Sequence, residues 1–269
     1  MLLKRTLVAL GLAVIGIPAI ILGGLFYEIL ITLLLGIAAW EYGRIFCTAG
    51  CNASQSLLVG GVVVLAAVRV FLPGFAPAAL TLLILAAMAW HLFDYEKGRN
   101  QAGSDFAVTA SGIVYLGWIG AYLIDIRNLS NGMWWVLLIL PAVWLADMAA
   151  YFVGKNLGRT PLAPRLSPKK TWEGYWAGVI VGTIGTAGLA LLWHRLGGPA
   201  VPLWKGAALG AALSILTTLG DLGESMFKRQ AGVKDSSNIL PGHGGVLDRI
   251  DSWLWGAALG YFLVIWFFI

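Results

Sequence analysis

Polar side chains at helical spacing interrupt an otherwise apolar segment near residue 221. Four of them are Asp221, Glu224, Ser225 and Lys228. Their spacing of i, i+3, i+4 and i+7 would place all four on one face of a helix. Turning such a stripe toward lipid would cost too much free energy. We therefore expect it to line a protein interior or a wet cleft, where carboxylates and a cation can do chemistry.

Two further carboxylates begin the last apolar segment. Asp248 and Asp251 are three residues apart, so the first turn of a helix would point both the same way. Two carboxylates held close repel each other unless a cation or a proton lies between them. Capping of a helix N-terminus explains one aspartate but explains a pair less well. The glycine-rich run just before them, which includes Gly244 and Gly245, predicts a loop.

Glycines and cations also mark the segment between residues 154 and 172. Glycines let backbone amides approach a phosphate closely, and lysines present point charges to it. The residues concerned are Gly154, Lys155, Gly158, Arg159, Lys169 and Lys170. A lone Lys-Lys pair is more typical of a membrane-surface patch, and Asp147 in the preceding span could equally be a polar helix-packing contact. These glycines and cations therefore indicate a phosphate-binding site only in combination with the carboxylates.

The composition indicates which elements position these residues. Of the 269 residues 59% are apolar and 12% are charged, about half the charged fraction of a soluble domain. The apolar residues form runs of roughly 17 to 25, a length that crosses a bilayer as a helix. We predict an all-α, polytopic transmembrane bundle of about nine spans: 6–23, 27–46, 56–72, 75–93, 105–125, 132–153, 173–195, 203–227 and 251–269.

The distribution of lysine and arginine predicts an orientation. With nine spans, 14 of the 18 lysine and arginine residues fall on the side of the N-terminus. The positive-inside rule then places the N-terminus in the cytoplasm and the C-terminus outside it. The loops 154–172 and 228–250 hold nine of those 14 residues. We therefore predict an N-terminal packing part, 1–130, and a C-terminal catalytic part, 131–269, whose loops face the cytoplasm.

The segment from Ser225 to Asp251 resembles the signature of the bacterial phosphatidate cytidylyltransferases, also called CDP-diacylglycerol synthases. Every fixed position of that signature is met: Ser225, Lys228, Arg229, Lys234, Asp235, Ser237, Leu240, Pro241, His243, Gly244, Gly245, Asp248, Arg249 and Asp251. The run from Ser167 to Thr171 is similar to the family's upstream motif. The resemblance covers residues 141–251 well, whereas residues 1–130 agree only in the number and general character of their spans.

The resemblance implies a reaction between CTP and phosphatidate that gives CDP-diacylglycerol and pyrophosphate. It also implies Mg²⁺ as cofactor, with a second cation left open. Asp221, Asp248 and Asp251 are the expected metal ligands, and together with Lys228 they are the expected catalytic residues. Substrate binding is expected for Lys169, Lys170, Ser225, Arg229, Lys234, His243, Gly244, Gly245 and Arg249.

Expected partners are CTP, phosphatidate and membrane lipid, without nucleic acid and with a homodimer left open. The expected location is the bacterial inner membrane, with the site on the cytoplasmic side. A CTP-dependent polyprenol kinase is the nearest alternative, but its hydroxyl substrate would call for a base. An anion transporter would place its charges near the bilayer midplane in two similar halves. A CDP-alcohol phosphotransferase would carry a four-aspartate pattern that this sequence lacks.

The predicted orientation can be tested with reporters fused to the C-terminus. Because nine spans separate termini on opposite sides, a phosphatase reporter there should be active and a cytoplasm-dependent fluorescent reporter dark. The same reporters fused after residue 160, in a predicted cytoplasmic loop, should give the reverse pattern. A bright fluorescent reporter at the C-terminus would contradict both the topology and the cytoplasmic position of the site.

Overall fold

The computed structural model describes residues 2–240, 242 and 244–269, and these residues form an all-α polytopic membrane protein. Seven helical segments among them are long and apolar enough to cross a bilayer. The first and third predicted spans overlap apolar helical segments shorter than 18 residues, Ala13–Leu22 and Gln55–Phe71, which are not among the seven. The prediction of a polytopic helical membrane protein is therefore confirmed.

The helices form two compact units, and each unit combines two separate stretches of the chain. The first consists of Met1–Asp125 and Phe227–Ile250, and the second of Ile126–Met226 and Asp251–Ile269. The chain passes between units inside helices rather than at loops. The predicted division after residue 130 concerns chemical role, and it stays a prediction.

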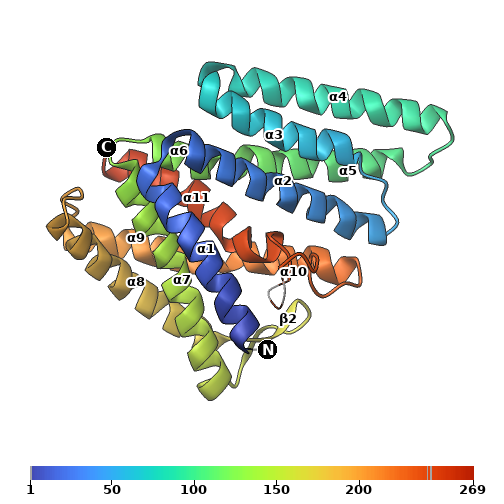
Figure 1. The fold of residues 1–269 in the computed structure, drawn as a ribbon. Coiled ribbons are helices and arrows are strands. Elements are labelled where there is room, and N and C mark those ends of the chain that lie inside the picture. The colour runs from blue at the N-terminus through green and yellow to red at the C-terminus, as the bar shows by residue number, and fades with distance from the viewer. Residues whose placement is uncertain (1, 241, 243) are drawn as a thin grey trace. The chain divides into compact units, whose positions relative to one another are not determined.

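Four helices of the first unit lie side by side, namely α2, α3, α4 and α5 (Figure 1). The helix that begins with α5 continues without a loop through a π-helical stretch, η2, to the end of α6. The elements of the first stretch are α1 (Leu2–Leu22), α2 (Gly24–Thr48), α3 (Gln55–Phe71), η1 (Pro73–Phe75), α4 (Ala76–Glu96), α5 (Ala102–Gly112), η2 (Ile113–Ile119) and α6 (Tyr122–Asn128). The apolar core between them includes the fully buried Leu58, Leu65, Ile113 and Leu116.

A buried ion pair fixes α3 against the long helix in the first unit. Arg69 donates to Asp125, and its guanidinium lies 4.2 Å from the ring centroid of Trp118 and 4.8 Å from that of Tyr122. Arginine suits such a place because it pairs with a carboxylate and stacks on aromatic faces at once. Arg69 is thus part of the packing.

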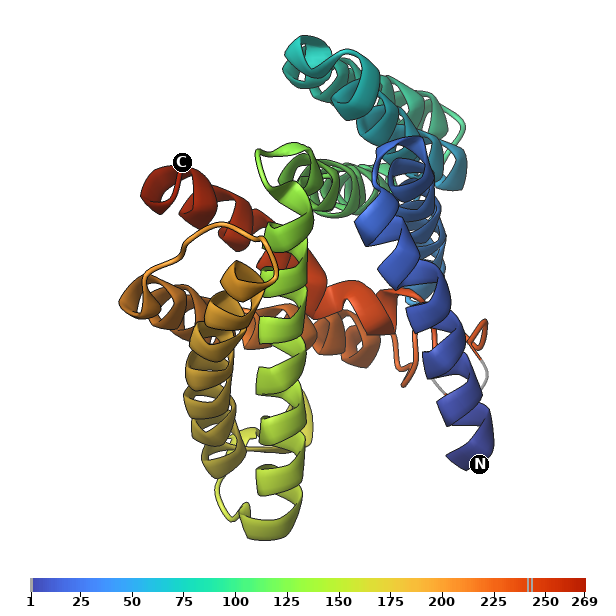
Figure 2. The ribbon, with the colours of Figure 1, turned by 60° about the vertical axis from the view of Figure 1, so that its left-hand side comes forward.

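The second unit is built around α7, α8 and α9, which contact one another (Figure 2). Pro141 inside α7 has no N–H and leaves the Leu137 carbonyl without its helical donor. The indole of Trp193 on α8 donates to that carbonyl at 2.9 Å. The elements are α7 (Gly132–Leu157), β1 (Pro161–Ala163), β2 (Ser167–Thr171), α8 (Trp172–Arg195), α9 (Leu203–Leu216), α10 (Thr218–Gln230) and α11 (Leu247–Phe267).

Glycines at every fourth residue of α8 let α7 and α8 approach closely. A Cβ added at Gly174 would lie 2.6 Å from the Ala150 carbonyl oxygen, and one at Gly178 would lie 2.8 Å from that of Ala146. Lipid offers no hydrophobic force between helices, so close van der Waals packing of small residues takes its place. Glycine thus allows α7 and α8 to pack backbone against backbone.

We predict that Gly178→Leu destabilises the second unit, because the new side chain would meet backbone in the α7–α8 contact. Overpacking of this kind typically costs about 1–3 kcal/mol. Thermal unfolding in detergent would measure the loss. Gly188→Leu is the matched control, since nothing lies within 4 Å of a Cβ at that position of α8. Equal stability of the two variants would contradict the proposed packing.

Candidate active site

A short hairpin presents the two predicted substrate-binding lysines in the second unit. β1 and β2 pair antiparallel, with Pro161 opposite Thr171 and Ala163 opposite Ser167. Side chains alternate along a strand, so Lys169 and Lys170 on β2 point to opposite faces. Lys169 is exposed, while Lys170 is partly buried. The sequence predicted only a loop here, because strands of this length carry no clear alternation.

The start of α8 holds this hairpin in place. The Glu173 carboxylate accepts hydrogen bonds from the backbone N–H groups of Arg159 and Thr160 and from the Thr160 hydroxyl, at 3.0–3.2 Å. The Thr171 hydroxyl accepts from the Gly174 N–H at 3.2 Å and caps the helix. Capping of this kind fixes the entry of the chain into the helix. The position of Lys170 therefore depends on these hydrogen bonds at the start of α8.

Lys170 forms an ion pair with Asp221 of α10. Its Nζ lies 2.5 Å from one carboxylate oxygen of Asp221, and the Ser225 hydroxyl donates weakly to the other at 3.4 Å. The structure thus brings together residues 51 positions apart in the chain. Of the predicted site, Lys170, Asp221 and Ser225 all belong to this cluster.

Two more carboxylates complete the cluster in the second unit. A Cβ at Gly220 would lie 2.7 Å from the backbone oxygen of Asp251, so α10 and α11 nearly touch at this level. The charges of Asp147, Asp221 and Lys170 all act on Asp251. The Asp251 carboxylate also accepts from the Ser252 N–H at 2.6 Å. Three carboxyl groups and one ammonium group thus gather at this point.

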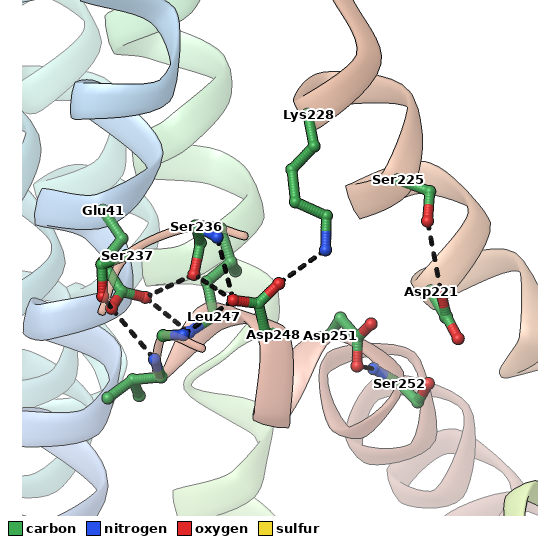
Figure 3. A network of polar contacts seen from close by, with 12 residues as sticks. Glu41, Asp221, Ser225, Lys228, Ser236, Ser237, Leu247, Asp248, Asp251 and Ser252 are labelled. Carbon is green, nitrogen blue, oxygen red and sulfur yellow. Dashed lines mark hydrogen bonds and ion pairs between the residues drawn. The ribbon is translucent and has the colours of Figure 1, made fainter. Parts of the chain in front are cut away.

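Asp248 lies in the first unit, where donors surround its carboxylate (Figure 3). One oxygen lies 2.5 Å from the buried Nζ of Lys228. The other accepts from the N–H and hydroxyl of Ser236, at 2.9 and 2.8 Å, and from the Gly245 N–H at 2.7 Å. Lys228 and Asp248 were predicted as catalytic residues, and they are direct partners.

The two predicted glycines of the loop are required by this arrangement. Gly244 has φ +83°, and a Cβ there would lie 2.6 Å from a carboxylate oxygen of Asp248. A Cβ on Gly245 would collide with the Ser236 hydroxyl and with the carboxylate of Glu41. The Gly245 amide donates to Asp248. Binding of substrate by these two glycines stays a prediction.

The other predicted substrate-binding residues differ in exposure. Arg229, Lys234 and Arg249 are exposed, as is Asp235. Glu224, by contrast, is buried on α10. His243 lies outside the described residues, as does Pro241 of the signature. Binding of phosphate by the three exposed cations stays a prediction.

Sequence reasoning missed two residues of the first unit that contact the signature loop. Glu41 on α2 accepts a hydrogen bond from the Leu247 N–H at the start of α11. The Ser236 hydroxyl donates to both Glu41 and Asp248. A signal for Glu41 was present, because it is an ionisable residue inside the predicted span 27–46. An ionisable residue inside a span is a functional candidate by default. Ser236 carried no comparable signal.

A divalent cation fits the residues of the second-unit cluster. No group of three or more His, Cys, Asp or Glu side chains arranged to hold a metal occurs in the described part of the chain. Mg²⁺, however, usually takes one or two carboxylates and completes its shell with substrate oxygens and water. Asp221 and Asp251 supply carboxyl oxygens, which are hard donors, and the charge of Asp147 also acts on Asp251. A metal role for Asp248 stays a prediction beside its present hydrogen bonds.

Comparison with known proteins adds independent evidence. Residues 3–267 match the model of the Cytidylyltransferase family. A phosphatidate cytidylyltransferase of Pseudomonas aeruginosa is 37% identical over 262 residues, which cover 94% of this chain and 93% of the relative. A phosphatidate cytidylyltransferase of Staphylococcus saprophyticus is 34% identical over 267 residues, covering 97% of this chain and 98% of the relative. The one from Synechocystis is 33% identical over 94% of each chain.

We predict that Lys228→Ala destabilises the protein, because it removes one member of a buried ion pair. Loss of one partner from such a pair typically costs about 3 kcal/mol or more. Chemical denaturation in detergent, followed by tryptophan fluorescence, would measure the change. Lys169→Ala, which removes an exposed lysine, should leave the denaturation midpoint within experimental error. If both variants unfold like the wild type, the Lys228–Asp248 pair does not stabilise the fold.

Proposed function

Because the chain belongs to the cytidylyltransferase family, we propose that it joins CTP to phosphatidate, giving CDP-diacylglycerol and pyrophosphate. It is an enzyme of the nucleotidyltransferase class. The observation that carries the proposal is the cluster of Asp147, Asp221, Asp251 and Lys170 within a membrane protein. A surplus of carboxylates beside a lysine suits a site where a cation and phosphate groups meet.

The proposed chemistry asks little of a general base. The phosphatidate phosphate is already an oxyanion near neutral pH, and it attacks the α-phosphorus of CTP as pyrophosphate leaves. What the reaction does need is cancellation of charge between two anionic reactants and their alignment. We infer that Lys170 binds phosphate oxygens and that Lys169 and Arg229 contribute positive charge. The acyl chains would stay in the bilayer while the headgroup reaches the site.

We propose Mg²⁺ as the cofactor, held by Asp221 and Asp251 and, as the sequence predicted, by Asp248. When bound, Mg²⁺ supplies positive charge against the triphosphate. Mutual repulsion between Asp221 and Asp251 supports this assignment, because a cation relieves it. A second cation is left open.

For the setting of the reaction, we propose nine spans, a cytoplasmic N-terminus and an active site that faces the cytoplasm of a bacterial inner membrane. The bias of lysine and arginine supports this orientation, and CTP is a cytoplasmic metabolite. We further propose that residues 131–269 carry the chemistry and residues 1–130 mainly packing. Membrane lipid is a partner, nucleic acid is not, and a homodimer is compatible with the proposal.

The proposed function can be tested with purified enzyme, labelled CTP and phosphatidate. We expect turnover that EDTA abolishes and added Mg²⁺ restores, and none with a polyprenol in place of phosphatidate. Asp221→Asn and Asp251→Asn, which keep shape but remove charge, should each lower kcat/KM about 10²-fold or more. Asp248→Asn should do the same.

Asp94→Asn, on α4 of the first unit, is the control and should turn over normally. Wild-type turnover that persists in EDTA would contradict the metal. Turnover with the polyprenol alone would contradict the substrate and favour the kinase alternative.

A further inference from the structure

Glu41 has an environment unlike that of an ordinary residue in a membrane span. It is fully buried on α2, and both of its carboxylate oxygens accept hydrogen bonds. The hydroxyls of Ser236 and Ser237 donate to it at 3.1 and 2.5 Å. The backbone N–H groups of Val246 and Leu247 donate at 3.0 and 2.7 Å (Figure 3). All of its donors come from the loop before α11 or from the start of that helix.

This carboxylate satisfies groups that a helix leaves open. The first four N–H groups of a helix have no partner within it, and negative charge is favourable beside them. Capping residues usually stand next to the helix in sequence, whereas Glu41 is 206 residues from Leu247. It therefore fixes the N-terminus of α11 to α2. Hydrogen bonds to an ionised acceptor are about twice as strong as neutral ones.

The Ser236 hydroxyl connects Glu41 to Asp248. Its oxygen lies 3.1 Å from a Glu41 oxygen and 2.8 Å from an Asp248 oxygen. A hydroxyl has one proton to donate, so the two carboxylates compete for it. The close approach of Gly245 to both Ser236 and Glu41 keeps this contact free of any side chain. A shift of Glu41 would therefore move Ser236 and release part of the donor set of Asp248.

We propose that Glu41 is a positioning residue for the reaction, although it lies in the N-terminal part to which the sequence assigned only packing. It holds the segment from Ser236 to Leu247 and, through Ser236, orients Asp248. In this role it acts through Asp248 and not on the substrates themselves. The inference rests on the proposed function, because its readout is turnover of CTP with phosphatidate.

The test compares Glu41→Gln, Glu41→Asp and Ser237→Ala with the wild type. Glu41→Gln places an amide donor against N–H and O–H donors, so kcat per folded enzyme should fall about 10- to 100-fold. KM for CTP should change less than about threefold, since the substrate contacts remain. Glu41→Asp keeps two acceptor oxygens and should recover part of the loss. Glu28→Gln, on the same helix, is the matched control and should leave kcat unchanged.

Hydrogen–deuterium exchange supplies a second readout. In Glu41→Gln the amides of Val246 and Leu247 should exchange faster, while peptides from α7 should not change. Glu41→Gln and Ser237→Ala remove a shared contact, so the loss in the double variant should be smaller than the product of the single losses. The Ser237→Ala and Glu41→Asp variants keep the proposal testable if Glu41→Gln does not fold.

Three outcomes would overturn the inference. Normal kcat in Glu41→Gln with faster loop exchange would mean that the anchored loop does not matter for turnover. A loss of kcat without faster exchange, or a loss of folded protein with normal kcat per folded molecule, would assign Glu41 another role. An inactive wild type would contradict the proposed function itself, whereas an active wild type with a normal Glu41→Gln would contradict this inference alone.

Discussion

A carboxylate taken out of water inside an apolar helix bundle needs a set of donors, and this requirement organises the first unit. Asp105 accepts from the Arg99 side chain and from the Asn52 N–H, each at 2.7 Å. Asp125 is paired with Arg69, and Glu41 accepts from two hydroxyls and two amides. The hydrophobic effect cannot select helix partners where lipid is equally apolar. These carboxylates therefore connect segments that are distant in sequence.

In the second unit the carboxyl groups lie near one another, whereas in the first unit they accept hydrogen bonds from direct donors. This difference distinguishes the candidate site. Asp147, Asp221 and Asp251 act on one another, with Lys170 as the cation that acts on all three. In the first unit a similar concentration of charge is balanced by direct donors, as Asp248 is by Lys228 and Ser236. An uncompensated group of like charges costs free energy unless a ligand removes it. The second unit therefore holds carboxyl groups whose ionised forms would be stabilised by a bound cation.

The helices could be predicted from apolar runs alone, because span length and composition are fixed by the bilayer. The face shared by Asp221 and Ser225 was predictable from helical spacing, and so was the resemblance of the signature. The hairpin around Lys169 was not, since its strands are held by Glu173 and by pairing rather than by alternation. The two-unit arrangement was also beyond the sequence, because contacts such as that of Glu41 with Leu247 span most of the chain. Asp248 and Asp251 are one helical turn apart, yet their partners come from different units, which spacing alone does not reveal.

The reach of Glu41 has a consequence for how the chain is made. Its donors Val246 and Leu247 leave the ribosome about 200 residues after it, which at about 5–20 residues per second means a delay of roughly 10–40 s. Throughout that interval α2 enters the membrane region with a carboxylate whose final partners do not yet exist. Until then, water, lipid headgroups or the insertion machinery must solvate the Glu41 carboxylate. Membrane insertion and completion of the first unit are therefore separate events in time, and the second waits for the last helix to be synthesised.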